Sequence, residues 1–142
     1  MGRLSRNKGK TGERELAHEL QRVLGVTARR GVQYAGGTDS PDVVTDIDSI
    51  HIECKRTEHF RLFEALEQSI RDAGESKVPV VMHRPNHRPW VVVLRLDDLP
   101  ALVETIHQFK ASGIGLQASG NKNNPEGSPK PKTKEVFNGE QN

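Results

Sequence analysis

The stretch Ile50-His51-Ile52-Glu53-Cys54-Lys55 constrains the fold of this 142-residue chain more than any other segment. Apolar and polar residues alternate along it, which is the pattern of a β-strand that turns one face to a core. Side chains two apart on a strand share a face. We therefore expect the two isoleucines and Cys54 to enter the core, and His51, Glu53 and Lys55 to share the opposite face.

The dipeptide Pro41-Asp42 precedes Glu53 by a spacer of ten residues, which opens with the apolar pair Val43-Val44. The polar residues after this pair can turn the chain between two neighbouring strands, so that Asp42 lies beside Glu53. Two carboxylates and the Lys55 ammonium group then meet at one edge of the sheet. The alternative is a turn started by Pro41-Asp42 and an ordinary, exposed Glu-x-Lys strand edge.

The chemistry of this trio predicts a magnesium site. Mg2+ binds oxygen ligands and keeps several waters, and Asp42, Glu53 and the backbone carbonyl of Cys54 would supply the protein ligands. Mn2+ would act as a substitute. A metal-bound water loses its proton more easily and can attack a phosphorus atom, while the cation offsets the charge on the phosphate. Lys55 would orient this water or help to deprotonate it, and would hold a phosphate oxygen.

Hydrophobic periodicity predicts a mixed α/β domain. Helices are expected over residues 11–24, with a cap at Thr11 or Gly12, over residues 60–73, and from a cap at Asp97 or Asp98 to residue 109. The expected strands are residues 26–30, 42–44, 50–55, 78–82 and 90–96, and the apolar composition of the last two suggests that they are buried.

Composition divides the chain into three parts. From residue 111 onward Gly, Asn, Ser, Pro and Lys dominate without an apolar pattern, which predicts a disordered tail over residues 111–142. Residues 1–10 form a basic N-terminal arm, and residues 11–110 form the folded domain. The sequence has no signal-peptide pattern and no apolar run long enough to span a membrane. We therefore expect a cytoplasmic protein without a membrane partner.

Positive charge is concentrated near the N-terminus. The whole chain has a net charge of +2, but its first thirty residues contain eight Arg and Lys against three Glu, a surplus of five. A basic arm of this kind can bind DNA phosphates, although it can also serve only as a solubilising tail. The candidate DNA-binding residues are Arg3, Arg6, Lys8, Lys10, Arg14, Arg29 and Arg30.

Residues 8–56 resemble the archaeal-type Holliday junction resolvases of the PD-(D/E)xK nuclease superfamily. The resemblance is carried by Lys8-Gly9-Lys10-Thr11-Gly12-Glu13-Arg14-Glu15-Leu16, then Arg29-Arg30-Gly31, a Gly-rich loop, Pro41-Asp42 and Ile52-Glu53-Cys54-Lys55. It implies a restriction-endonuclease-like mixed sheet flanked by helices, with residues 11–110 as the nuclease domain. It also implies a Mg2+-dependent endodeoxyribonuclease that cuts four-way junctions in DNA recombination and repair, acting as a homodimer. A phage-encoded relative acting in the host cytoplasm fits equally well.

The resemblance assigns roles to individual residues. Glu13 would be the carboxylate of the first helix, Asp42 and Glu53 the metal ligands, and Lys55 the catalytic lysine, whereas Glu13 taken alone is most simply a helix-dipole residue. Gln68, on the second helix, could orient a water or a phosphate, or could be solvated. A zinc pair from His83 and His87 is disfavoured because prolines surround them. His51 shares the face of Glu53 and could contact substrate, but a polar strand residue is the simpler interpretation.

Two other functions stay open at this point. The chain could be a nuclease of the same superfamily that acts on linear duplex or single-stranded DNA, or a non-catalytic DNA-binding module with this fold. For a dimer, the apolar segments 78–82 and 90–94 could supply the interface.

Overall fold

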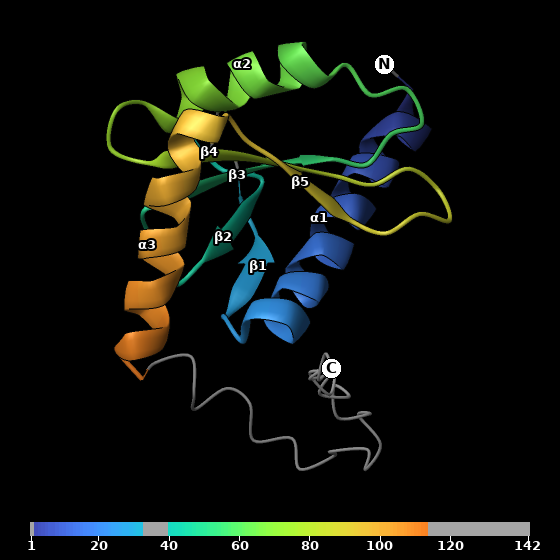
Figure 1. The fold of residues 1–142 in the computed structure, drawn as a ribbon. Coiled ribbons are helices and arrows are strands. Elements are labelled where there is room, and N and C mark those ends of the chain that lie inside the picture. Colours follow the sequence, from blue (N-terminus) through green and yellow to red (C-terminus); the bar gives the residue numbers. More distant parts are fainter. Residues whose placement is uncertain (1, 33–39, 114–142) are drawn as a thin grey trace, which may run out of the picture.

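The computed structural model describes residues 2–32 and 40–113, and in them three α-helices surround a five-stranded sheet (Figure 1). The elements, in chain order, are α1 (Arg3–Leu24), β1 (Ala28–Arg30), β2 (Val43–Thr45), β3 (Ile50–Lys55), α2 (Leu62–Ala73), β4 (Val78–His83), β5 (Val91–Val93), the 3-10 helix η1 (Leu96–Asp98) and α3 (Leu99–Ala111). The predicted fold class, a mixed sheet flanked by helices, is confirmed.

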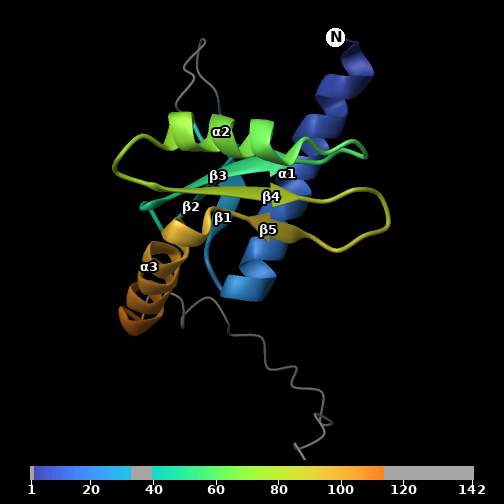
Figure 2. The same cartoon turned by 45° about the horizontal axis from the view of Figure 1, so that its top comes forward.

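The strands lie in the order β1-β2-β3-β4-β5. β1, β2 and β3 are antiparallel neighbours, β4 runs parallel to β3, and β5 returns antiparallel to β4. A parallel pair needs a crossover connection, and α2 supplies it by crossing one face of the sheet (Figure 2). β3 is therefore the central strand, so the alternative of an ordinary exposed Glu-x-Lys strand edge is wrong.

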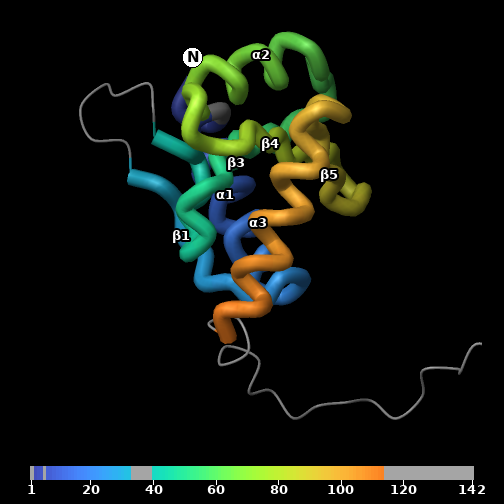
Figure 3. The backbone as a smooth tube through the Cα atoms, turned by 60° about the vertical axis from the view of Figure 1, so that its left-hand side comes forward, coloured from blue at the N-terminus to red at the C-terminus, as the bar shows by residue number. Residues whose placement is uncertain are grey.

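Helices cover both faces of the central strands (Figure 3). On one face, α1 and α3 pack against an apolar layer that includes Leu16, Ile52 and Phe109, with Cys54 at its border. On the other face, α2 packs through Leu66 onto a smaller cluster around Val81. The predicted apolar face of β3 thus lies in the core. Its polar face is covered as well, by α2.

The first helix begins eight residues earlier than predicted: α1 starts at Arg3 and not at Thr11. Gly2 occupies the cap position, and the Thr11 hydroxyl donates to the Asn7 carbonyl at 2.9 Å inside the helix instead of capping it. Arg, Leu and Lys are good helix formers, so the preceding residues continue the helix that the buried turns anchor. Gly25 ends α1 in the left-handed conformation with φ 68°, as expected of a glycine after a helix.

The C-terminal elements also differ from the prediction. β5 has only three residues and lies at the edge of the sheet, where Val91 and Val92 are 45% and 53% exposed, so the prediction of a buried strand is wrong there. Asp98 precedes α3 as predicted, but its carboxylate pairs with Arg95 at 2.6 Å and makes no capping bond.

Some predictions fall outside the described residues. Residues 33–39 of the Gly-rich loop and residues 114–142 of the predicted tail belong to this group, whereas Ala111 is the last residue of α3. In the part of the chain that is described, no helix is both long and apolar enough to cross a membrane.

Candidate active site

Strand pairing brings Asp42 to Glu53. Val43 of β2 is paired with Ile52 of β3, and continuing this antiparallel register by one residue places Asp42 opposite Glu53. The Asp42 N–H donates to the Ile52 carbonyl at 3.0 Å, and the Asp42 Oδ2 accepts the Cys54 N–H at 2.8 Å. The two predicted metal ligands therefore lie side by side on neighbouring strands.

The backbone at Gly31 packs closely against Pro41 and Asp42, and this contact fixes the position of Asp42. The N–H of Gly31, just after β1, donates to the Asp42 carbonyl at 2.8 Å. A Cβ atom on Gly31 would lie 2.1 Å from the Pro41 carbonyl oxygen, a contact that no side chain can make. Only glycine fits here, so the Arg30-Gly31 part of the sequence motif has a steric reason.

Lys55 lies between Glu53 and the second helix. Its Nζ is 2.7 Å from Glu53 Oε1 and donates to Gln68 Oε1 at 3.1 Å. Gln68 is therefore not freely solvated, because it accepts a hydrogen bond from Lys55; its role toward a water or a phosphate stays a prediction. The lysine also has a fixed backbone, because its carbonyl accepts the Arg84 N–H at 3.1 Å and lies 2.9 Å from His83 Nδ1.

Burial and charge change the acidity of the site. Burial, followed by repulsion from Glu53, raises the pKa of Asp42 to about 7, although the Cys54 N–H and the Lys55 ammonium group oppose this change. Burial also raises the pKa of the Cys54 thiol, and the neighbouring carboxylates add to the effect. Cys54 is thus a neutral thiol at pH 7, which agrees with its prediction as a core residue and excludes a thiolate nucleophile.

Glu13 approaches the same site from α1. Its charge contributes to the raised pKa of Asp42, and its carboxylate pairs with Arg30 of β1. Arg30, a candidate DNA-binding residue, is only half-exposed and is held in this ion pair. Three carboxylates therefore converge here with two cationic side chains, Arg30 and Lys55.

The donor set fits a divalent cation. A cation between Asp42 and Glu53 would remove the repulsion that raises the Asp42 pKa. The Cys54 N–H points to Asp42, and because the N–H and C=O groups of one strand residue point to the same side, the Cys54 carbonyl faces that side too. Two carboxylates and a carbonyl are oxygen ligands of the kind that Mg2+ and Mn2+ take.

Comparison with known proteins identifies the family. The model of a family described as phage putative PDDEXK endonuclease matches residues 4–125, most of the chain. The chain belongs to this family. Searches of curated proteins and of solved structures gave no match.

Membership in the PD-(D/E)xK nuclease superfamily is thereby confirmed, and these PDDEXK endonucleases use divalent metal ions and act on DNA. The family match does not distinguish junction resolvases from other nucleases of the superfamily.

The basic residues predicted to bind DNA in this PDDEXK endonuclease occupy two places. Arg3, Arg6 and Lys10 lie with Asn7 around one hollow on the first turns of α1, which extend past the sheet (Figure 2). The other four are Lys8, Arg14, Arg29 and Arg30, and all but Arg30 are exposed.

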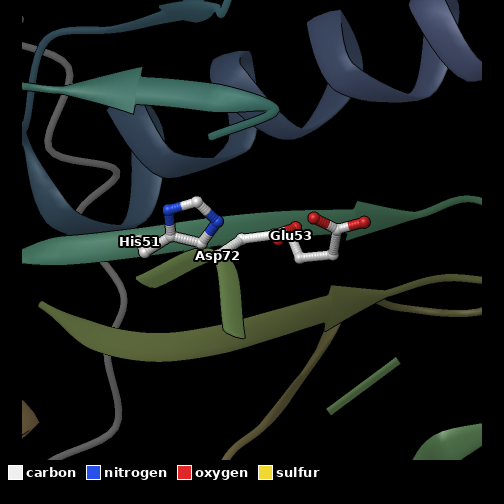
Figure 4. Close-up of side chains that lie close together, drawn as sticks. All are labelled: His51, Glu53 and Asp72. Atoms are coloured by element: carbon white, nitrogen blue, oxygen red, sulfur yellow. The ribbon is translucent and has the colours of Figure 1, made fainter. Parts of the chain in front are cut away.

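One polar residue near the site was expected from the sequence and another was not. His51 lies on β3 on the face of Glu53, as expected, but it is only 1% exposed because α2 covers it. Asp72 of α2 contributes a carboxylate close to His51 and Glu53 (Figure 4). A signal existed: Asp72 follows Gln68 by four residues, and residues at this spacing share a helix face.

His83 and His87 do not form the zinc pair considered from their spacing. His83 belongs to β4 and stacks on Phe60 with ring centroids 4.0 Å apart, whereas His87 is an exposed loop residue with φ 58°. The buried imidazole instead supports the end of β3 through the Lys55 carbonyl.

Proposed function

We propose that this PDDEXK endonuclease is a Mg2+-dependent endodeoxyribonuclease that cuts four-way DNA junctions, with Mn2+ as a substitute. The observation that carries the proposal is the convergence of Asp42, Glu53 and Lys55 at the end of the central strand, where Lys55 is 2.7 Å from Glu53. The junction as substrate rests on the resemblance of residues 8–56 to resolvases.

Each side chain of the site has a chemical task in this proposal. Asp42, Glu53 and the Cys54 carbonyl would hold the cation, whose chemistry would be to make a water more acidic and to offset negative charge on the phosphate. Lys55 orients the attacking water and holds a phosphate oxygen, and Gln68 keeps the ammonium group in place through the 3.1 Å hydrogen bond. Glu13, paired with Arg30, is the third carboxylate and borders the site.

DNA binding is assigned to the basic residues on and beside α1. The exposed Arg3, Arg6 and Lys10 lie on helical turns beyond the sheet, and Arg14 and Arg29 are exposed nearer the site. Contacts of this kind go to phosphates and do not read sequence. In this proposal residues 1–10 are a DNA-binding extension, residues 11–110 the nuclease domain and residues 111–142 a tail. The protein acts in the cytoplasm of the host cell.

A homodimer suits a junction substrate. A four-way junction has approximate two-fold symmetry, so a two-fold dimer would place two sites for two matched nicks. Of the two segments considered for the interface, β4 is unsuited because Val80 and Val81 are fully buried. β5 remains suitable: its exposed Val91 and Val92 border an apolar cavity of about 910 Å3 that also touches α1 and α3.

A cleavage assay with two substrates tests the proposal. Full-length protein is given a synthetic four-way junction or a linear duplex of the same arms, with Mg2+ or with EDTA. We expect Mg2+-dependent cuts near the branch point, lost in both Asp42→Asn and Glu53→Gln although DNA binding persists. Asp48→Asn, at an exposed turn position, is the matched control and should cut normally.

The other outcomes separate the alternatives. Equal cutting of duplex and junction would indicate a nuclease that acts on linear duplex DNA. Cutting of single strands alone would indicate a nuclease that acts on single-stranded DNA. Wild-type protein that binds DNA but never cuts with Mg2+ or Mn2+ would be a non-catalytic module. Cleavage retained in both carboxylate variants would refute the assigned metal site.

A further inference from the structure

The polar face of β3 forms a second cluster of potential metal ligands with α2. His51, Glu53 and Asp72 each offer one ligand atom, and these atoms all lie within 4.8 Å of one another. His51 and Glu53 stand two residues apart on β3 and project to the same side, where Asp72 approaches from α2 (Figure 4). Asp42 is not part of this cluster.

The spacing of these atoms is close to that of a metal centre. An ion with nitrogen and oxygen ligands at about 2.1 Å can hold two of them no more than about 4.2 Å apart. Small side-chain rotations would therefore bring the three groups, now within 4.8 Å, onto one ion. All three sit on regular elements, β3 and α2, so the backbone already holds them in place.

The surroundings favour a cation at this position. His51 and Glu53 are 1% and 5% exposed, so the negative charge of Glu53 and the nearby charge of Asp72 are poorly screened by water. The described positive partner of Glu53 is Lys55, on the side of the catalytic residues. Ser69, which shares the buried face of α2 with Asp72, is fully buried, and its hydroxyl has no hydrogen-bond partner among the described residues. A buried hydroxyl without a partner is costly, and a water ligand of an ion could satisfy it.

We propose that His51, Glu53 and Asp72 form a site for a divalent transition-metal ion, separate from the Asp42–Glu53 site and sharing Glu53 with it. This ion clamps α2 onto β3 and holds the Glu53 carboxylate. The imidazole selects the kind of ion: a nitrogen ligand suits transition metals such as Co2+ and Zn2+, whereas Mg2+ and Mn2+ prefer oxygen ligands.

Titration of the full-length protein with Co2+ alone tests the site. Bound Co2+ has a visible absorption that depends on its ligands, and equilibrium dialysis counts the ions. We expect two Co2+ per wild-type chain. Asp72→Asn and His51→Gln should each lose one ion, with binding at that site weakened at least about tenfold, since even loss of an outer partner of a metal ligand costs about 10- to 100-fold.

Asp42→Asn distinguishes this site from the proposed catalytic site. It should keep the ion bound by His51, with its absorption band, and its thermal unfolding temperature should still rise with Co2+. His87→Gln, at an exposed histidine, is the control and should bind as wild type does. Because this readout does not involve cleavage, the site can stand even if the protein never cuts a junction.

Two results would overturn the inference. The first is an unchanged number of Co2+ ions and an unchanged absorption in Asp72→Asn. The second is a wild-type protein that binds one ion, which Asp42→Asn removes. Circular dichroism shows whether the buried His51→Gln variant folds. If it does not, Asp72→Asn alone decides the question, because Asp72 is only partly buried and asparagine has nearly the same shape.

Discussion

At the scale of single residues, Asp42 shows most directly how the fold opposes a charge that the proposed chemistry requires. Its carboxyl group is partly buried beside Glu53, and burial and the Glu53 charge raise its pKa to about 7. The Cys54 N–H at 2.8 Å limits the effect but does not cancel it. The fold therefore keeps the carboxylate in an environment that a bound cation would relieve.

We predict that the stability of the metal-free protein falls as pH rises from about 4 to 7. The folded-state pKa of Asp42, about 7, exceeds the ordinary value of about 3.9 in an unfolded chain. The folded state therefore binds this proton more tightly, and the stabilisation, complete below about pH 4, is lost as pH rises through 7. Thermal unfolding in EDTA from about pH 4 to pH 8 measures it, with Asp42→Asn as reference. Identical pH dependence of the two proteins would contradict the prediction.

Lys55 should tolerate neither loss nor enlargement of its side chain. We expect Lys55→Ala and Lys55→Arg both to bind junction DNA and to cleave it very slowly. Arginine stays charged but is broader than an ammonium group, and a displacement of about 1 Å at a reacting centre can cost on the order of a hundredfold in rate.

Single-turnover cleavage rates check the Lys55 prediction, with Lys110→Ala, an exposed position on α3, as the control. Near-wild-type turnover of the arginine variant would mean that Lys55 only clamps a phosphate.

At the scale of elements, α1 joins two tasks in one helix. Its first turns carry exposed basic residues, while its later turns bury Leu16 and Leu20 against the sheet. The helix passes so close to the end of β3 that Gly12 lies against Arg56. This contact helps to fix how Glu13 approaches Asp42.

Two glycines of α1 should respond in opposite ways to alanine. A Cβ on Gly12 would lie 2.5 Å from the Arg56 Cβ, whereas a Cβ on Gly9 would meet nothing within 4 Å. We expect Gly12→Ala to destabilise the protein by about 1–3 kcal/mol through overpacking, and Gly9→Ala to stabilise it by about 0.5–1 kcal/mol. Urea denaturation measures both, and equal effects of the two substitutions would show that α1 packs elsewhere.

The basic turns of α1 should contribute to DNA affinity and little to folding. We expect the triple variant Arg3→Ala, Arg6→Ala, Lys10→Ala to bind DNA more weakly at low salt, with an unfolding temperature close to that of wild type. Each lost phosphate contact should reduce the slope of log affinity against log salt by about 0.9. Binding titrations at several salt concentrations measure it, and equal affinity at low salt would mean that these turns only add solubility.

At the scale of the whole molecule, the sheet has one strand edge with an apolar surface. β5 is short, Val91 and Val92 are half-exposed, and the edge borders the apolar cavity between α1 and α3. Exposed apolar edge strands pair readily with other chains. This edge is therefore the position at which we expect two copies to meet.

If the proposed dimer forms through β5, Val92→Lys should convert it into a monomer. Light scattering during size-exclusion chromatography measures the mass, and we expect single nicks to persist while paired cuts in one junction are lost. Phe63→Lys, on the exposed side of α2 and 75% exposed in the wild type, is the control and should stay dimeric. A monomeric wild-type protein at micromolar concentration would exclude this interface.

The sequence by itself determined the features that short-range pattern encodes. Alternation over six residues predicted the strand at Ile50–Lys55 and its apolar face, and the spacing from Pro41-Asp42 predicted the neighbour of Glu53. These predictions succeed because side-chain direction along a strand repeats every two residues, whatever surrounds it. The start of α1 was missed because its first turns lack the apolar periodicity that marked the rest of the helix.

The tertiary structure decided what covers each face. Only the crossover of α2 buries His51 and Glu53, brings Gln68 within 3.1 Å of Lys55 and sets Asp72 beside the imidazole. These contacts join residues 13 to 21 positions apart, and no local periodicity specifies the angle at which a helix crosses a sheet. Tertiary structure also decides the acidity of Asp42. The sequence shows that a carboxyl group is present, but its pKa of about 7 arises from burial and from charges that folding brings together.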